Sequence, residues 1–408
     1  MLTERTHDDA RHAVRMLGLA QAAAFAVTGI TVTIGPLSLH ELSGHKGFGG
    51  GLLAVFILAG GAGALVAGRL MRRMAQRRVL AASHRVYGLA GLLAAAAGAA
   101  HSPRLIIAAA FPLGFGHGAS LLGRSVAVDL HEAGERGRAV GRILAIGAVG
   151  ALSGPALVAG LRRLAMDTGL DPHMLPWLAV PVLGALGALA VSRLRVGGTP
   201  RTAAPAPTPR PASRDRRHAR AGMGTAAIVL AGTQAAMLAL MSVVPVHIHD
   251  QGGDDAVMAA VLGAHLASMY GLAPLLGAAI DRWGHRSGLL LGAGLCVGGA
   301  LLSAVAGVPL IAAVGLVGLG SGWCSAYLGA TAAAAVSAEP QDRAYVLGVV
   351  DMTASVTAAT AGLLTGLFVG LLGVLTLTLA VASAMGLVVL IALRPRPVPA
   401  APPVAAPR

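Results

Sequence analysis

Two pairs of side chains with soft metal-binding atoms stand at helical spacing in successive apolar stretches of the chain. Met237 precedes Met241 by four residues, and His265 precedes Met269 by four. Residues four apart lie on one face of a helix, one turn from each other. Thioether sulfur and neutral imidazole suit Cu(I), whereas magnesium and calcium prefer oxygen ligands. The pattern therefore predicts that these four residues bind a soft metal ion transiently during its passage.

The depths of the four residues within their helices favour a single site. The two helices run antiparallel and are joined by a short loop at the outer surface. At 1.5 Å per residue, Met241 and Met237 lie roughly 9 and 15 Å below that surface, and His265 and Met269 roughly 12 and 18 Å below it. We expect their ligand atoms to meet near the bilayer midplane, where carriers built from repeats bind substrate.

Packing is the alternative explanation for these residues. Methionine is a flexible core residue, so packing is the simpler explanation for Met237 and Met241 taken alone. An ionisable side chain inside a bilayer costs roughly 2 kcal/mol or more, and it usually serves a pathway or a partner. His265 therefore favours the binding site over packing.

Polar side chains near the outer surface offer a first contact for an arriving metal ion. His247, His249 and Asp250 form a compact set just beyond the Met237 pair. An outer loop must be polar in any case, so ordinary loop polarity is the alternative.

Two further titratable residues fall within apolar stretches. Asp351 is the clearest candidate for proton coupling, although it stands close enough to Arg343 to form an ion pair with it instead. His117, within the sequence Gly114-Phe-Gly-His-Gly, is a second candidate that would face a central cavity. Helix packing explains the glycines of that segment but not its histidine.

The composition places these residues in a membrane protein. Of the 408 residues, 55% are hydrophobic and only 12% are charged, with a mean hydropathy of +0.73. A soluble domain carries about a quarter charged residues. The net charge of +14 comes from arginines clustered between apolar stretches, which indicates membrane topology rather than nucleic-acid binding. No hydrolase, kinase or nucleotide-binding loop is visible, so we expect neither an enzyme nor a cofactor.

Twelve apolar stretches are each long enough to cross a bilayer. The fold class is therefore an all-α membrane protein with twelve transmembrane helices in two six-helix pseudo-repeats. Residues 1–194 and 223–393 form the two bundles. Residues 195–222, rich in proline and arginine, are expected to be a solvated linker, and residues 394–408 a disordered tail.

Arginine placement predicts the orientation. Arginines gather before the first helix, between helices 2 and 3, in the linker, and in the corresponding loops of the second half, whereas the alternate loops hold fewer. The positive-inside rule then puts both termini, the linker and the tail in the cytoplasm, with the chain in the cytoplasmic membrane.

The two halves also repeat each other. Residues 68–77 after helix 2 correspond to residues 277–286 after helix 8, displaced by 209 positions. At the same displacement Pro36, His40 and Glu41 correspond to the proline, histidine and acid that end helix 7. Parallel six-helix repeats are an established transporter design.

The loop after helix 8 resembles the loop signature of the major facilitator superfamily. Its residues are Gly277, Asp281, Arg282, Gly284 and Arg286. The resemblance implies twelve helices and alternating access, and we expect Asp281 to meet a neighbouring helix N-terminus or the arginines beside it, so that the loop locks one access state. The first copy has Arg72 at the position of the acid and Ala75 at that of the glycine, which puts an acid-based lock there in doubt.

The Met237 and His265 pairs resemble the MxxxM and HxxxM signature of one branch of that superfamily, the CcoA-like copper importers. The resemblance implies uptake of copper, as a transported substrate, across the cytoplasmic membrane. The partners expected are the lipid bilayer and a copper ion or another small solute, with no nucleic acid and no obligate protein partner.

A rival interpretation comes from helix 5. Gly141, Gly150, Gly154 and Pro155 reproduce most of a glycine and proline pattern that resembles proton-coupled drug exporters, although its closing glycine pair is missing. Small residues permit close helix approach in many carriers, and proline permits bending. A proton-coupled exporter of drugs or small molecules is therefore the alternative function.

Overall fold

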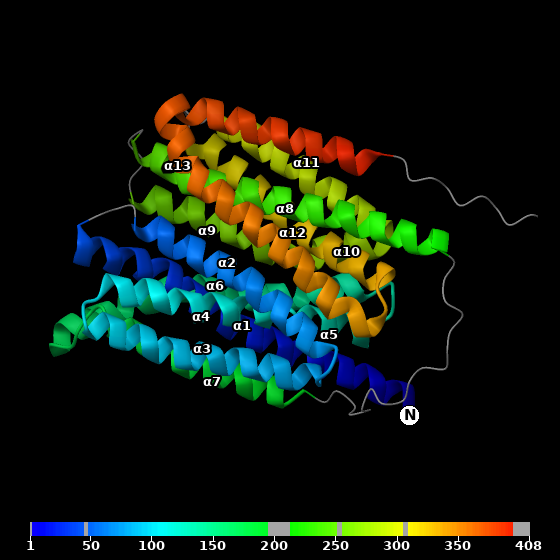
Figure 1. Cartoon of the computed structure of the whole chain (residues 1–408), viewed down its shortest axis with the longest axis horizontal. Coiled ribbons are helices and arrows are strands. Elements are labelled where there is room, and N and C mark those ends of the chain that lie inside the picture. Colours follow the sequence, from blue (N-terminus) through cyan, green and yellow to red (C-terminus); the bar gives the residue numbers. More distant parts are fainter. Residues whose placement is uncertain (1, 45–47, 195–212, 251–254, 305–308, 395–408) are drawn as a thin grey trace, which may run out of the picture.

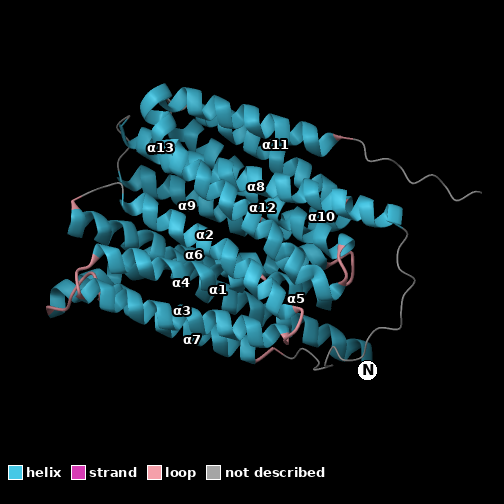
Figure 2. Ribbon diagram, in the orientation of Figure 1, coloured by secondary structure: helices cyan, strands magenta, loops and turns pink. Residues whose placement is uncertain are grey.

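The computed structural model describes the chain except for residues 1, 45–47, 195–212, 251–254, 305–308 and 395–408. The described part is helical, without strands (Figure 2). The helices of the first half are α1 (Leu2–Ser43), α2 (Phe48–Met71), α3 (Gln76–Ala99), α4 (Pro103–Leu121), α5 (Gly123–Leu130), α6 (Arg136–Thr168), the short η1 (Leu175–Leu178) and α7 (Ala179–Ser192). Those of the second half are α8 (Ser213–Asp250), α9 (Asp255–Gly271), α10 (Ala273–Trp283), α11 (His285–Ala304), α12 (Pro309–Ser337) and α13 (Pro340–Leu393).

Within the described residues, twelve spans are long and apolar enough to cross a membrane, which agrees with the predicted number. Some spans differ from single helices. Residues 103–130 divide into α4 and α5, and residues 260–283 divide into α9 and α10, where Pro274 lacks the N–H that a continuous helix needs. Conversely, α13 contains two spans that turn at Gly373, whose φ of +78° is open to glycine at little cost.

The predicted linker and tail fall largely outside the described residues. Helix α8 already begins at Ser213, so the end of the range predicted as linker is helical. Residues 195–212 and 395–408 are not described.

The two halves lie side by side (Figure 1). Within the first half α1 packs on α6 and α2 on α4, while within the second half α8 packs on α13 and α11 on α12. The halves meet along α2 against α13 and along α6 against α9 and α10. The two contacts are equivalent in the sequence repeat. The repeat relates α2 to α9 and α10, and it relates α6 to the first span of α13.

One end of the bundle, called here the basic end, holds the turns α2–α3, α5–α6, α10–α11 and α12–α13. Its arginines are Arg69, Arg72, Arg73, Arg77, Arg78, Arg136, Arg138, Arg282, Arg286 and Arg343. Here the backbones of the two halves are in contact at Gly137 and Gly277. A Cβ on Gly277 would lie 2.1 Å from the Gly137 carbonyl oxygen, so a larger residue does not fit there. The other end, called the opposite end, carries the turns α3–α4 and α6–η1.

Candidate functional site

A cavity of about 270 Å³ lies between the two halves. We call it the central cavity. Residues of α1, α2 and α4 from the first half, and of α8, α9, α12 and α13 from the second half, form its wall. The lining residues used below are Phe25, Thr28, Val32, Phe56, Gly60, His117, Gln234, Met237, Met269, Tyr270, Trp323, Tyr327, Asp351 and Ala354.

Aromatic rings make up much of this wall and connect the two halves. The Phe25 ring of α1 and the Tyr270 ring of α9 have centroids 4.6 Å apart. Tyr270 meets Trp323 edge-on at 6.1 Å, and Trp323 stacks on Tyr327 at 5.0 Å. The Trp323 indole N–H donates to Gln234, which satisfies its polar atom and leaves the ring face for an apolar body.

A buried ion pair joins the halves beside this cavity. Arg124 Nη2, on α5, donates to Asp351 Oδ1, on α13, at 2.7 Å. The two residues are 2% and 8% exposed. The guanidinium carbon also lies 3.9 Å from the Tyr327 ring centroid, within cation–π distance. Asp351 therefore has a charged partner inside the bundle rather than at its surface.

This pairing corrects one prediction and adds a residue. Arg343, considered from the sequence as the partner of Asp351, instead donates from Nη1 to Asp129 Oδ1 at 2.7 Å. The sequence did not single out Arg124. Its signal was present, because Arg124 and Asp351 are opposite charges that each stand alone in an apolar stretch.

His117 lines the central cavity, as expected for a residue that helix packing alone does not explain. Its Nδ1 atom lies 2.9 Å from Thr28 Oγ1 and 3.1 Å from the Tyr87 hydroxyl. Its glycine neighbours serve packing, because a Cβ on Gly118 would lie 1.7 Å from the Gly60 carbonyl oxygen. The segment thus combines close approach of α2 and α4 with one polar group on the cavity wall.

Two of the four predicted metal ligands lie on the wall of one cavity. Met237 and Met269 both line the central cavity. Met241 and His265 are not among its lining residues. Helical spacing fixes a shared face but not which neighbour that face meets, so the convergence of four ligand atoms stays a prediction.

His265 faces α12 instead. It is 2% exposed, and its Nδ1–H donates to the Leu316 carbonyl oxygen at 2.7 Å. Gly320 of α12 makes room, since a Cβ there would lie 3.2 Å from that nitrogen. This bond gives the imidazole the partner that a polar group inside a membrane needs.

The first half shows a contrast at the equivalent positions. The residues displaced by 209 from the four predicted ligands are Thr28, Val32, Phe56 and Gly60, and all of them line the central cavity. The repeat therefore places this face of the first half, more fully than that of the second, against the central cavity.

The predicted first-contact residues can be placed only by their backbone. His247, His249 and Asp250 belong to the last turns of α8, and their side chains lie outside the described part of the chain.

Asp281 binds the N-terminus of α6 at the basic end. Its Oδ1 accepts from the Gly137 N–H at 2.7 Å and its Oδ2 from the Arg138 N–H at 2.9 Å. The N-terminal N–H groups of a helix lack internal partners and carry partial positive charge, so a carboxylate stabilises them. Of the two partners considered from the sequence, the structure shows the helix N-terminus.

The other residues of this loop have local positions. Gly284 ends α10 with a φ of +86°, a conformation that favours glycine. Arg286 Nη2 donates to the carbonyl oxygens of Ala392 and Leu393 at the end of α13. Arg282 is exposed in the last turn of α10.

The first copy of the loop binds the other half with the charges exchanged. Arg72 Nε lies 2.9 Å from Asp342 Oδ1, in the first turn of α13, and its guanidinium carbon lies 5.3 Å from the Tyr345 ring centroid. Beside it, a Cβ on Gly68 would lie 2.6 Å from the Ala344 carbonyl oxygen. In the first copy, the loop residue Arg72 binds an acid on the helix of the other half. In the second copy, the loop residue Asp281 binds the helix N-terminus directly.

The opposite end is paired differently. Among the described residues, its contacts between basic and acidic side chains join only residues of the first half: Arg162 pairs with Glu41 at 3.0 Å, His173 lies 3.6 Å from Glu41, and His101 lies 2.8 Å from Asp171. Burial lowers the pKa of His173, and this effect outweighs that of the neighbouring carboxylates.

The sequence profile of the Major Facilitator Superfamily matches residues 17–269 and also residues 225–407. Together the two matches span most of the chain. The chain belongs to the Major Facilitator Superfamily. As a carrier of this superfamily it is not an enzyme, and transport of this kind needs no cofactor.

The chain is similar to two Bacillus subtilis (strain 168) proteins. It is 28% identical to the uncharacterized MFS-type transporter YdeG over 351 residues, covering 83% of this chain and 81% of YdeG. It is 25% identical to the uncharacterized MFS-type transporter YddS over 380 residues, covering 87% of this chain and 84% of YddS.

Solved structures of superfamily members share the fold. The human organic anion transporter MFSD10 (TETRAN) matches with a TM-score of 0.75 at 14% identity, covering 94% of this chain and 99% of that one. The transporter FucP, in the outward conformation, matches with a TM-score of 0.67 at 16% identity, covering 92% and 97%. At these identities the likeness concerns the fold alone.

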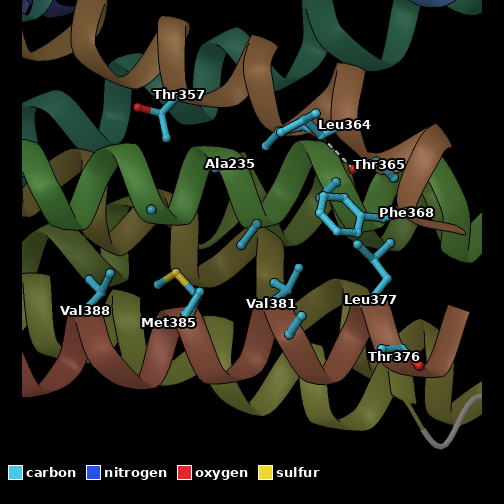
Figure 3. A pocket seen from close by; sticks show the side chains of 16 residues that line it. Ala235, Thr357, Leu364, Thr365, Phe368, Thr376, Leu377, Val381, Met385 and Val388 are labelled. Carbon is cyan, nitrogen blue, oxygen red and sulfur yellow. Dashed lines mark hydrogen bonds between the residues drawn. The ribbon is translucent and has the colours of Figure 1, made fainter. Parts of the chain in front are cut away.

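A lateral groove of about 390 Å³ between α8 and α13 provides a contrast to the central cavity (Figure 3). Apolar side chains such as Phe368, Leu377 and Met385 line it. The hydroxyls of Thr357 and Thr365 donate to carbonyl oxygens of their own helix. A groove with this mostly apolar wall suits apolar chains rather than a polar solute, so the central cavity is the candidate transport site of this superfamily member.

Proposed function

We propose that this chain is a secondary carrier that moves a small amphipathic organic solute through the central cavity by alternating access. The observation that supports this proposal is the wall of that cavity, to which both halves contribute side chains. The rings of Phe25, Tyr270 and Trp323 offer faces to an apolar body. His117 and Asp351 offer polar contacts to a head group. Pockets with apolar walls and a few polar groups bind organic molecules in this way.

The pattern of contacts at the two ends supports alternating access. Asp281 and Arg72 each bind the start of a helix of the other half at the basic end. At the opposite end, the ion pairs of the described residues stay within the first half. We take the basic end to be the closed gate of this state, and transport requires that these contacts break.

The arginines of the basic end supply the orientation in this proposal. By the positive-inside rule that end faces the cytoplasm of a cell whose cytoplasmic membrane holds the carrier, with both termini inside. The state then faces outward. Residues 1–194 and 223–393 form the two bundles that rock against each other.

Copper uptake is the second candidate. The observation that favours it is the presence of two thioethers, Met237 and Met269, on the wall of one cavity. Sulfur of this kind binds Cu(I). The aromatic wall is larger than such an ion needs, and Met241 and His265 are not on it, so we rank the organic solute first.

The glycine and proline pattern of the fifth span, which resembles drug exporters, lies on α6 and has a packing role. A Cβ on Gly150 would lie 1.8 Å from the Ala22 carbonyl oxygen, and a Cβ on Gly154 would lie 2.7 Å from Gly29 Cα. These glycines let α6 approach α1 closely. They therefore support the fold without setting a direction of transport.

A pair of alanines on α13 allows a matched test. Ala354 lines the central cavity and Ala361, two turns further on, lines the lateral groove. In vesicles containing the purified protein, we expect Ala354→Leu to reduce uptake of labelled amphipathic solutes at least about tenfold, because the added methyl groups occupy solute space. Ala361→Leu serves as the control, with uptake near that of the native protein.

The same vesicles separate the two candidates. Uptake of radioactive copper that falls in Met237→Leu and Met269→Leu, with no organic solute transported, would replace the first proposal by the second. Equal loss of solute uptake in both alanine variants would remove the central cavity from the proposed path.

A further inference from the structure

A groove of about 440 Å³ lies on the surface of the first half, between α6 and α7. Both helices pack on α1, which forms the floor of the groove, and α7 lies at the edge of the bundle (Figure 1). Four apolar side chains of its wall are about half exposed or more: Leu19, Val149, Leu186 and Leu189. In a membrane, a groove with such walls is open to the lipid chains.

Three arginines stand at the basic end of this groove, one on each of its helices. Arg193 itself lines the groove, directly after α7. Arg15 precedes Leu19 by four residues on α1, and Arg142 precedes Val149 by seven on α6, so each shares a helix face with its partner. All three arginines are exposed. Since α1 and α6 begin at the basic end and α7 ends there, the arginines continue the three walls toward one place.

These arginines have no acidic partner in the protein. Among the described residues, no ion pair involves Arg15, Arg142 or Arg193. Asp8, on the same face of α1 as Arg15, lies 3.9 Å from Arg11 instead. An arginine at the edge of the hydrocarbon region is unfavourable unless an anion or water meets it. The groove therefore ends in three guanidinium groups that an anion from outside the chain can approach.

The length of the groove matches one leaflet of a bilayer. On α1 its wall extends from Met16 to Ala26, which is a rise of about 15 Å. The hydrocarbon core of a bilayer is about 30 Å thick, so one leaflet contributes about half of it. A single acyl chain has this length, and its methylene groups suit the apolar wall.

We infer that this groove binds an anionic phospholipid of the leaflet at the basic end. One acyl chain lies between α6 and α7 on the floor formed by α1. The phosphate accepts hydrogen bonds from Arg15, Arg142 and Arg193, because the guanidinium fork fits phosphate oxygens with two parallel bonds. Basic pockets between membrane helices bind anionic head groups in this way. A zwitterionic lipid offers the same chain and phosphate, but the arginines repel its cationic group.

Two lipids with identical chains test the inference: dioleoylphosphatidylglycerol, which is anionic, and dioleoylphosphatidylcholine, which is zwitterionic. Each is titrated into the purified full-length carrier in detergent, and bound lipid is counted by native mass spectrometry. We expect the native protein to bind the anionic lipid at least about tenfold more tightly. The triple variant Arg15→Gln, Arg142→Gln and Arg193→Gln should lose this preference while its affinity for the zwitterionic lipid stays the same.

A matched triple variant controls for net charge. Arg73, Arg282 and Arg394 are exposed arginines of the basic end on other helices or turns. Their replacement by glutamine removes the same charge, and we expect the preference for the anionic lipid to remain. All six positions are exposed, so both triple variants should fold, and melting temperatures in detergent check this.

A substitution in the wall tests the seat of the chain separately. Ala22 lines the groove on α1. Ala22→Phe fills space that the acyl chain would occupy, so we expect the affinity for both lipids to fall about tenfold or more.

Three results would overturn the inference. Equal affinity of the native protein for the two lipids would remove the role of the arginines. Equal loss of the preference in the two triple variants would show that only the net charge of the basic end matters. Unchanged lipid binding in Ala22→Phe would place the bound lipid elsewhere on the surface.

Discussion

Arg124 and Asp351 meet at 2.7 Å inside the helix bundle although they lie 227 positions apart and belong to different halves of the chain. Each is almost fully buried. The pair is thus a direct link between the two bundles, and its Asp351 lines the central cavity.

The first prediction concerns the stability that this pair provides. Arg124→Gln leaves the Asp351 carboxylate without its partner, and a broken buried pair costs about 3–5 kcal/mol. We expect the melting temperature in detergent to fall clearly in the single variant. The fall should be smaller when Asp351→Asn is added. Equal losses in the single and double variants would show that the pair is not coupled energetically.

The second prediction concerns the Asp281 contact. Asp281→Asn removes the charge that stabilises the N-terminus of α6, an effect of about 1 kcal/mol or more. We expect the basic end to open more often. Spin labels at the exposed Met74 and Glu339, one in each half, should show a longer distance in the variant. An unchanged distance distribution would mean that Asp281 does not hold the gate.

The third prediction ranks the two gate contacts. Arg72 and Asp342 are about half and one third exposed, so their ion pair contributes at most about 1 kcal/mol. We expect Arg72→Gln to open the basic end less than Asp281→Asn, and the effect to shrink in high salt. Exchange of the charges, Arg72→Asp with Asp342→Arg, should restore the native distance. Failure of that restoration would argue against a direct ion pair.

The fourth prediction separates the four residues of the sequence motif. Met237→Leu and Met269→Leu should change the affinity for transported solutes, because both side chains line the central cavity. Met241→Leu should not. His265→Leu should instead lower stability by about 1–3 kcal/mol, because the Leu316 carbonyl oxygen loses its donor. Equal loss of copper uptake in all four variants would support the four-ligand site.

The fifth prediction concerns acid at the opposite end. Burial lowers the pKa of His173, so the folded state binds a proton less readily than the unfolded chain. The stability that this provides is full above the ordinary histidine pKa of about 6.5 and declines as the pH falls below it. We expect melting temperatures to drop between pH 8 and 5, and to drop less in His173→Gln. A steeper fall in the variant would mean that protonation of His173 stabilises the folded state, contrary to this prediction.

Some features of this protein follow from its sequence alone. Apolar stretches of about 20 residues specify membrane-spanning helices, since the backbone has no other way to satisfy its polar groups in lipid. The spacing of 209 positions identifies the repeat, and the glycine of the second loop marks the end of α10, where the structure has Gly284 at a positive φ. The helices and their ends are local properties that neighbouring residues determine, and the repeat emerges when the chain is compared with itself.

Other features were decided by the tertiary structure. Helical periodicity put His265 and Met269 on a shared face, yet His265 binds α12 while Met269 reaches the cavity. A carboxylate at position 351 needed a cation, but only the packing of α5 against α13 selected Arg124 over Arg343. Such choices depend on distances between residues far apart in the chain, and the sequence carries no measure of those distances before the helices pack.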